Sequence, residues 1–504
     1  MRIALLAALT CLAAPLRAQC PDGTPPPCGR AVSHAALPEA NSVAVLYFDN
    51  ESRDTNDLYL ADGLTEEIIT RLTGIERLTV RSRHVVRRFR GTALGDPAVV
   101  ARALNVAYLV TGSVRRSGDR IRVNAELIRA VGGAQVWARP FDQSGSDAIA
   151  IQETVASEVA TGIVGRLLPA ERGAIAARTT RDPVAYDHFL RGNYLLATRG
   201  GDEMMRAAQE FDAAVAADPR FTDAVARIAY AYATILDNEF DVGMTRDVLV
   251  ARGVATAERA VRMDSTSSDA WLALAYIRES QYPRTLDGAR EAFVRALALN
   301  PRSAEAHHQY ADFLARTGDS AQARVENRRA LALEPGRGAT YVQLMNQAFT
   351  VGRLEEALRY ADSAEAGNVD VLVWRFLYNG LLGDTAAQRR ALAAPRSGSR
   401  AELMQLFELY LSTPRGDTAA VRRFRKAATA ASPATVTGTQ ILRTFLAALL
   451  MKLGDREGAL IAIESATPRG AVLHWVMGAP VFNPIRNEPR FQRTWNESDP
   501  AGAR

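Results

Sequence analysis

The sequence predicts two folded parts, a small α+β domain followed by an all-α solenoid of paired helices. Between residues 42 and 168, runs rich in β-branched and aromatic residues alternate with amphipathic stretches. From Asp182 onward, small and apolar residues recur at helical spacing. Within this second part the pattern has a period of 34 residues, at which Gly352 follows Gly318. Self-similarity at such a period is typical of stacked helix pairs.

The clearest repeat runs from Ala304 to Pro335 and reads AEAHHQYADFLARTGDSAQARVENRRALALEP. Small residues such as Ala311 and Ala323 allow neighbouring helices to approach closely, while Tyr310 and other large side chains fill the space between them. This segment resembles the tetratricopeptide repeat. The resemblance implies protein or peptide partners, held in a groove along the first helix of each pair.

We expect the repeat array to extend over residues 182–495. It carries an insertion around residues 237–245, and its pattern weakens over residues 370–433, where the helix pairing is left open. The closing segment PVFNPIRNEPRFQRTW combines prolines that stop helix packing with aromatics that can cover the exposed end. It is therefore interpreted as a terminal cap.

The first folded part, residues 42–168, has the predicted order β-α-β-α-β-β-β-α. Glu66 and Glu67 lie in the first predicted helix and are interpreted as part of a solvated face. The turn Ser117-Gly118-Asp119 joins two strands as a hairpin. The expected elements are a strand at 42–48, a helix from 61 to about 72, a strand at 78–86, a helix at 97–104, strands at 106–115, 121–129 and 135–141, and a helix at 149–168.

Three stretches of this part, SVAVLYFDN, YLADGLTEEIITRL and LNVAYLVTGSVRRSGDRIRVNAELIRAVGGAQVWARPFD, resemble the small domain related to TolB amino-terminal and FlgO-type modules. The resemblance covers about 125 residues and carries no catalytic motif. In chains of this kind a cyclase, kinase or DNA-binding domain often precedes the module. Here an export signal stands in that place, so these activities are not carried over.

Residues 1–18 read MRIALLAALTCLAAPLRA and are predicted to be a cleaved secretory signal peptide. Lipidation of Cys20 and an uncleaved anchor are the alternatives; no transmembrane segment is expected once the signal is removed. Residues 19–41 form a linker in which Cys20 and Cys28 pair as a possible disulfide. The expected location is periplasmic or otherwise extracytoplasmic.

The formal net charge of +5 comes almost wholly from arginine, since the chain has only two lysines, Lys426 and Lys452. Twelve arginines lie between Arg77 and Arg129. A solvated strand face, a surface for an acidic protein or lipid headgroup, and a nucleic-acid site all fit this excess. We expect no nucleic acid, because the chain carries an export signal.

Candidate groove residues of the array are Arg278, His307, Gln309 and Gln343. Tyr230, Tyr232, Tyr276 and Tyr310 are interpreted as packing residues, with the groove as the alternative. His307 and His308 are neighbours on a helix and point about 100° apart, so they do not favour a shared metal ion. No phosphate-binding loop, paired-histidine zinc motif or nucleophile elbow occurs, and we expect no catalytic residue, metal or cofactor.

The sequence therefore predicts an exported, non-enzymatic interaction scaffold or adaptor of the bacterial cell envelope, whose first domain binds an envelope component. The first alternative is a regulatory or sensor subunit that acts on a separately encoded signalling enzyme. The second is a hydrolase or cyclase in its own right, for which the sequence offers no catalytic constellation.

Overall fold

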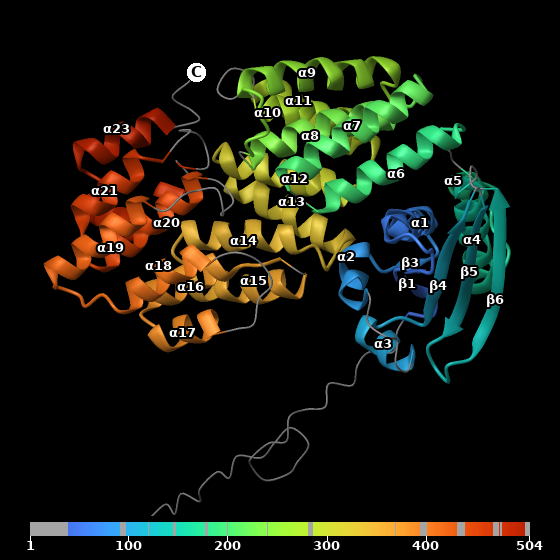
Figure 1. Cartoon of the computed structure of the whole chain (residues 1–504), viewed down its shortest axis with the longest axis horizontal. Helices are drawn as coiled ribbons and strands as arrows, with labels where there is room; N and C mark the ends of the chain where they lie inside the picture. Colours follow the sequence, from blue (N-terminus) through green and yellow to red (C-terminus); the bar gives the residue numbers. More distant parts are fainter. Residues whose placement is uncertain are drawn as a thin grey trace, which may run out of the picture.

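The fold was analysed in a computed structural model of the chain (Figure 1). It describes residues 39–498 apart from 91–96, 119, 145–147, 177–179, 199, 239, 281–285, 368, 394–400, 431–438, 467–472 and 474–475. The predicted signal peptide, the linker up to residue 38 and the Cys20–Cys28 pair lie outside the described residues. No helix in the described ranges is both long and apolar enough to cross a membrane.

A small α+β domain, the module, occupies residues 39–164. Its sheet has the order β3-β1-β4-β5-β6, with β1 parallel to β3 and β4, and with β4, β5 and β6 antiparallel; β2 pairs with β4. The helices α1 and α4 contact each other and the sheet. The elements are β1 (Ser42–Val45), β2 (Asp49–Asn50), α1 (Leu58–Thr73), β3 (Thr79–Val80), α2 (Arg83–Val86), α3 (Pro97–Leu104), β4 (Tyr108–Ser117), β5 (Arg120–Arg129), β6 (Gln135–Ser144) and α4 (Ala148–Val164).

Hydrophobic alternation explains why one face of this sheet is covered. In β5 the odd positions Ile121, Val123 and Leu127 are fully buried, whereas Arg120 and Arg122 are exposed. By contrast β1 is buried along its whole length, as expected for a central parallel strand. The part of the sheet formed by β5 and β6 therefore has one face against α4 and one polar face toward solvent, whereas β1 is covered on both faces.

The predicted strand at 78–86 is wrong over most of its length. Only Thr79 and Val80 pair with β1, and the chain then turns at Ser82 into the short helix α2. Val86 is fully buried, so the apolar run reflects packing of a helical turn rather than a strand. A short apolar run does not distinguish the two by periodicity alone.

The array follows the short helix α5 (Pro169–Ala176) and consists of antiparallel helix pairs. The pairs are α6 (Pro183–Thr198) with α7 (Gly201–Ala217), α8 (Thr222–Asp237) with α9 (Arg246–Met263), α10 (Ser268–Glu279) with α11 (Leu286–Leu299), α12 (Ala304–Arg316) with α13 (Ser320–Leu333), α14 (Gly338–Thr350) with α15 (Leu354–Ala366), α16 (Leu372–Leu382) with α17 (Thr385–Ala393), α18 (Ala401–Leu411) with α19 (Thr418–Ala430), and α20 (Thr439–Lys452) with α21 (Arg456–Glu464). In the described part of the weak stretch at 370–433, α16 contacts α17 and α18 contacts α19, and α16 also contacts α20.

Glycine and capping residues set the register of these pairs. Gly318 and Gly352 both follow a first helix and have φ values of +92° and +77°, a region that glycine enters without a Cβ penalty. Ser303 caps α12 by accepting a hydrogen bond from the Ala306 amide, and Asp319 caps α13 through Gln322. The regular spacing of turns and caps explains the 34-residue period.

The C-terminal end is closed by the 3₁₀ segment η4 (Pro480–Ile485) and α23 (Pro489–Ser498). Phe482 and Phe491 are fully buried, and α23 contacts α21. Both rings belong to the buried cluster that contains residues of α20 and α21, and the role of this segment as a terminal cap stays a prediction.

A glycine-to-alanine pair of variants tests the close packing of the first helix pair. A Cβ at Gly192 of α6 meets the Phe211 ring at 2.5 Å, whereas a Cβ at Gly173 of α5 meets nothing within 4 Å. We expect Gly192→Ala to lower the free energy of unfolding by about 1–3 kcal/mol through overpacking. Gly173→Ala gains about 0.5–1 kcal/mol from helix propensity. Urea unfolding of both variants measures the difference; a stabilised Gly192→Ala chain contradicts the packing.

Candidate functional site

The candidate site is the contact between the module and the inner face of the array, which we define as the face formed by the first helices α6, α8, α10, α12 and α14. Figure 1 shows α1 and α2 lying between the sheet and this face. The contact has two ends. One joins α1 to α6, and the other joins α2 to the turn between α13 and α14.

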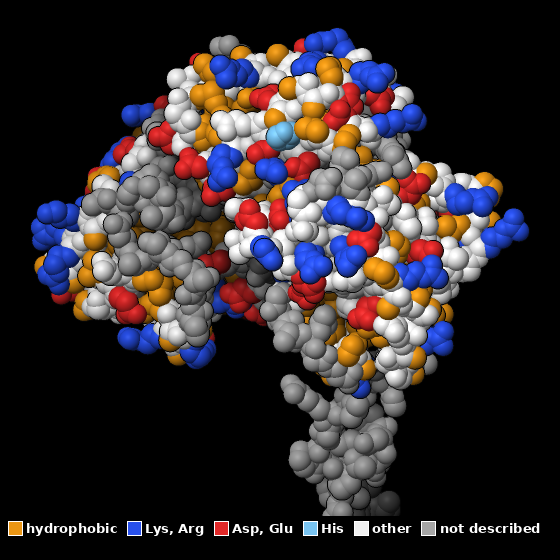
Figure 2. Space-filling model, turned by 45° about the vertical axis from the view of Figure 1, so that its right-hand side comes forward, with side chains coloured by type: hydrophobic (Ala, Val, Ile, Leu, Met, Phe, Trp, Pro, Cys, Tyr) orange, Lys and Arg blue, Asp and Glu red, His pale blue; other side chains and the backbone are white. Residues whose placement is uncertain are grey.

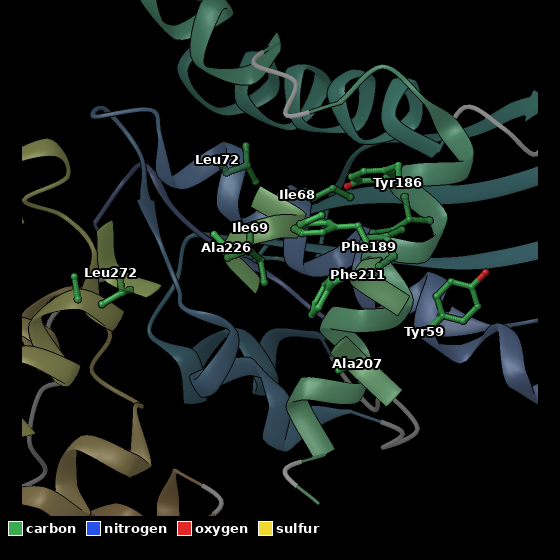
Figure 3. Packing of buried hydrophobic residues seen from close by; sticks show 14 of the residues in the cluster. Tyr59, Ile68, Ile69, Leu72, Tyr186, Phe189, Ala207, Phe211, Ala226 and Leu272 are labelled. Atoms are coloured by element: carbon green, nitrogen blue, oxygen red, sulfur yellow. The ribbon is translucent and has the colours of Figure 1, made fainter. Parts of the chain in front are cut away.

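At the first end α1 lies directly on α6. A Cβ at Gly63 meets the Leu190 side chain at 2.8 Å, so the helices approach closely at the glycine. Ile68 and Ile69 of α1 share one buried cluster with Phe189 of α6 (Figure 3). This cluster continues from the sheet through the first four helix pairs, to Ala323 of α13. The module and the front half of the array therefore have a common core.

Polar contacts fix the orientation of this end. The Tyr59 hydroxyl donates to Asp187 Oδ1 at 2.7 Å, and Arg116 Nη2 donates to the same oxygen at 2.9 Å. Behind them the Tyr186 hydroxyl donates to Gln152 Oε1 of α4 at 2.8 Å. Burial and the hydrogen bond to Asp187 raise the pKa of Tyr59 to about 12. Its hydroxyl thus stays protonated and able to donate throughout the physiological range.

At the second end α2 rests on residues 334–337. His84 Nε2 lies 3.2 Å from Glu334 Oε2, and a Cβ at Gly336 meets Val85 Cγ2 at 2.4 Å and its backbone nitrogen at 3.0 Å. Arg337 is buried and donates to Glu334 Oε2 at 3.0 Å and to Glu305 of α12. Only glycine at position 336 leaves room for the α2 backbone.

Between the two ends runs a band of partly buried charges. Glu66 of α1 accepts from the Tyr47 hydroxyl at 2.8 Å and from Arg83 Nη1 at 3.1 Å. On the array side Glu305 accepts from the Tyr230 hydroxyl at 2.6 Å. Burial acts to raise the pKa of Glu305, but the charges of Arg337 and His308 and the hydrogen bonds from Tyr230 and Arg337 together outweigh it and hold the pKa well below its ordinary value. Paired in this way, the carboxylates stay ionised although they are partly removed from solvent.

The pKa values of His84 and Glu334, the two titratable groups of the α2 contact, are shifted by burial and by neighbouring charges. Burial lowers the pKa of His84, against the hydrogen bond with Glu334, which raises it. Burial acts to raise the pKa of Glu334, but the hydrogen bond from His84 and the charge of Arg337 lower it to about 2. The charged groups around His84 are Glu334, Arg337 and Arg83, together with Glu66 of α1.

The four predicted groove residues occupy different places. Gln309 lies on the inner face, where its amide donates to the Tyr230 hydroxyl at 3.2 Å and to Glu305 at 3.0 Å. His307 lies between α12 and α13, with Nδ1 2.6 Å from Glu326 Oε2. Gln343 contacts His308 through its amide, and Arg278 Nη2 pairs with Glu258 of α9 at 3.2 Å. The structure thus brings only Gln309 of the four into the band of partly buried charges described above.

Other members of the site were missed by sequence reasoning. Glu66 and Glu67 were interpreted as solvated, yet Glu66 pairs with Arg83. Burial raises the pKa of Glu67, against the charges of Arg71 and of Arg227 in α8. The only sequence signal for their burial was that two adjacent acids stand at the centre of a helix with a wide apolar stripe. Amphipathic helices on protein surfaces carry the same pattern, so the signal does not distinguish the two cases. Tyr232 and Tyr276 are buried and Tyr310 packs against the core, as the packing interpretation expects, whereas Tyr230 also lies on the inner face, where its hydroxyl donates to Glu305.

The arginine-rich segment does not form one positive face. Arg77 pairs with Glu171 at 2.6 Å, Arg90 with Asp62 at 2.6 Å and Arg122 with Asp142 at 2.8 Å. In Figure 2 basic and acidic side chains are interspersed over the face that is shown. Within the described residues, no group of three or more histidine, cysteine, aspartate or glutamate side chains is arranged to hold a metal ion.

Two family models match the chain. Residues 39–158 match the second domain of HilA/YgeH-like transcriptional regulators, so the TolB/FlgO resemblance of the module is not the one that the family models give. Residues 292–325 match the tetratricopeptide repeat, which agrees with the prediction for the array.

Among curated proteins, the chain is 32% identical over 256 residues to a protein of Rhizobium meliloti (strain 1021) named putative adenylate cyclase 3. The match covers 51% of this chain and 43% of the relative, so the chain spans less than half the length of that protein.

Among the solved structures that match this chain, two are similar to it in fold. A thermophilic tetratricopeptide-repeat protein of Thermus thermophilus is 22% identical and has a TM-score of 0.33; the match covers 39% of this chain and 98% of that protein. A monomeric mutant of IFIT1, solved with m7Gppp-AAAA, is 13% identical and has a TM-score of 0.43; the match covers 70% of this chain and 86% of that protein.

Acid is expected to weaken the α2 contact. The docked form holds His84 with a lowered pKa and Glu334 with a pKa of about 2, so it binds fewer protons than the released form. Stability from His84 is therefore lost as the pH falls below about 6.5, and stability from Glu334 is lost as it falls below about 4.5. In His84→Gln the upper part of this pH dependence disappears and the lower part remains. Melting temperatures of both proteins between pH 8 and pH 4 measure the difference, and parallel curves contradict the assignment.

The Gly336 contact is testable by adding one methyl group. Gly336→Ala forces the Cβ against Val85 and is expected to displace α2 from the array, which speeds trypsin cleavage at Arg83, Arg87 and Arg88 several-fold. Gly288→Ala is the control, because its Cβ meets only the Arg278 side chain at 3.4 Å or beyond. Equal cleavage rates in the two variants contradict the close contact.

Proposed function

We propose that the chain is an exported interaction scaffold of the bacterial cell envelope. The array holds a protein or peptide partner along its inner face, and the module, read as TolB/FlgO-like, binds an envelope component. Export rests on the segment MRIALLAALTCLAAPLRA at residues 1–18, and protein binding rests on the tetratricopeptide match.

The observation that carries this proposal is the seating of α1 on the inner face. The helix α1 lies on α6, where Gly63 approaches Leu190, and the charge of Arg227 in α8 acts on Glu67 of α1. Buried residues of α1, α6 and α8 belong to one cluster (Figure 3). Binding of a helix in a groove likewise places a helix against first-helix side chains. The inner face therefore has the shape and chemistry to accept a helix, and the chain's own module fills its front part.

A second surface of the module is open to a different partner. The sheet face away from α1 carries exposed Arg115, Arg122 and Asn124, and β6 is an edge strand in which Val136 is exposed. The helix α1 covers the front of the inner face, and the open sheet face lies on the opposite side of the module. One partner can therefore bind the sheet face while another binds the array. This arrangement suits an adaptor without catalytic residues.

A regulatory subunit is the alternative function. It is favoured by the relative named putative adenylate cyclase 3, which shares 256 aligned residues with this chain and is more than twice as long as the aligned part. In that case the module and array sense a partner and pass the signal to an enzyme on another chain.

The test uses the full-length chain with a C-terminal tag, expressed in a Gram-negative host and cross-linked in intact cells. We expect the chain in the extracytoplasmic fraction, with stoichiometric protein partners identified by mass spectrometry and with no turnover of nucleotide or ester substrates. Retention in the cytosolic fraction contradicts the envelope role. A purified chain that makes cyclic nucleotide contradicts the scaffold assignment.

A further inference from the structure

The helix α19 near the C-terminal end of the array has one apolar side and one basic side. Its sequence, TAAVRRFRKAATA, contains four basic residues and no acidic one. Arg422, Arg423 and Lys426 are exposed on the basic side. The opposite side packs into the array through four buried residues, namely Ala420, Val421, Phe424 and Ala428.

The positive charge of the chain is concentrated around this helix. Residues 404–452, from within α18 to the end of α20, contain seven basic residues and two acidic ones, Glu408 and Asp417. The excess of five equals the formal net charge of the whole chain, so the remaining residues are neutral in sum. The seven basic residues, which we call the basic band, are Arg415, Arg422, Arg423, Arg425, Lys426, Arg443 and Lys452.

The basic band extends along the length of α19, because α19 contacts both α18 and α20. At the C-terminal end of α19, Arg443 of α20 donates to the carbonyl oxygen of Ala428 at 2.8 Å. At the other end, Lys452 lies near Arg415, and burial together with the charge of Arg415 lowers the pKa of Lys452. Two cations therefore lie close together at this end of the helix.

The exposed members of the basic band lack acidic partners. Arg425 pairs with Asp455, whose Oδ2 lies 2.7 Å from Arg425 Nε. By contrast, Arg422, Arg423 and Lys426 form no ion pair with any other residue that the structure describes. Arg422 and Lys426 also stand four residues apart, a spacing at which like charges on a helix repel each other. An anion beside them relieves this repulsion.

The surroundings of these charges favour a lipid surface over a protein partner. In its described part, the exposed side of α19 carries only small or polar residues between the basic ones, namely Thr418, Ala419 and Thr429. Protein interfaces are centred on aromatic and aliphatic anchors, which this side does not offer. Anionic headgroups require only charge at the surface, and guanidinium groups bind phosphate through paired hydrogen bonds.

We propose that the basic band is a docking surface for the anionic phospholipid headgroups of a membrane, with Arg422, Arg423 and Lys426 in direct contact with headgroup phosphates. The other members of the band add to the attraction. Figure 1 shows α19 on the side of the molecule away from the module, so docking leaves the module free. This inference goes beyond the proposed scaffold function by adding a membrane contact, and it does not depend on the partners of the array.

The first experiment measures sedimentation of the full chain with two kinds of vesicle at physiological salt. One kind contains equal parts of phosphatidylglycerol and phosphatidylcholine, and the other contains phosphatidylcholine alone. Since each basic residue at an anionic surface strengthens binding about fivefold, we expect at least tenfold tighter binding to the anionic vesicles. High salt is expected to abolish the difference. Equal binding to the two kinds of vesicle overturns the proposal.

The second experiment locates the binding on α19. Combining Arg422→Gln, Arg423→Gln and Lys426→Gln is expected to weaken binding to the anionic vesicles at least tenfold. Glutamine has a helix propensity close to that of arginine and lysine, so the variant keeps the helix. Circular dichroism checks its folding, and unchanged vesicle binding in the folded variant overturns the proposal.

The matched control combines Arg324→Gln, Arg328→Gln and Arg359→Gln. It removes the same charge from exposed positions on α13 and α15, which are also second helices of their pairs. Because physiological salt screens charges beyond about 8 Å, binding is expected to stay within about twofold of the wild-type value. An equal loss in both triple variants shows attraction by net charge alone and overturns the site.

Competition separates lipid from other anionic partners. Polyglutamate or duplex DNA, added to vesicle-bound chain at equal anionic charge, is expected to leave most of the chain on the vesicles. Displacement by polyglutamate overturns the lipid assignment in favour of an acidic protein, and displacement by DNA overturns it in favour of nucleic acid. A chain retained in the cytosolic fraction contradicts the envelope role but leaves the vesicle result unchanged, so the two proposals fail separately.

Discussion

The packing of α1 on α6 is the contact on which the rest of the structure depends. A solenoid of helix pairs leaves one face of its first helices without a neighbour, and apolar residues there need cover. Here the module supplies it, because Gly63 lets α1 approach Leu190 and a single buried cluster then runs from β1 to α13. The front of the inner face is consequently part of the protein interior. The module and the front of the array therefore form one folded unit rather than two domains joined by a flexible linker.

Charges at this contact select one geometry. Asp187 accepts hydrogen bonds from Tyr59 and Arg116 at one end, and Glu334 accepts one from His84 of α2 at the other end. Burial of unpaired charge is costly, so any shift of the module that separates these partners is penalised at both ends.

Local pattern was enough to predict the parts but not their contact. Gly318 and Gly352 mark turns that need a positive φ, so the array could be read from its period. The β-branched and aromatic runs of the module likewise predicted most of its strands. The segment around Val86 was predicted to be a strand but forms a helical turn, because a buried helical turn and a short strand can have the same composition. Glu66, Asp187 and Glu305 gave no signal, since their partners are distant in sequence, and only Gln309 of the predicted groove residues reached this network.

The measurement that tests the central claim most directly is native-state hydrogen exchange of the full chain. If the module and the front of the array share one core, the amides of α1, from Ile68 to Leu72, exchange as slowly as those of α6 and respond to denaturant together with them. This is the result that the shared cluster predicts. Exchange of α1 that is faster than that of α6 and insensitive to unfolding of the array would show two independent units, and would contradict the account.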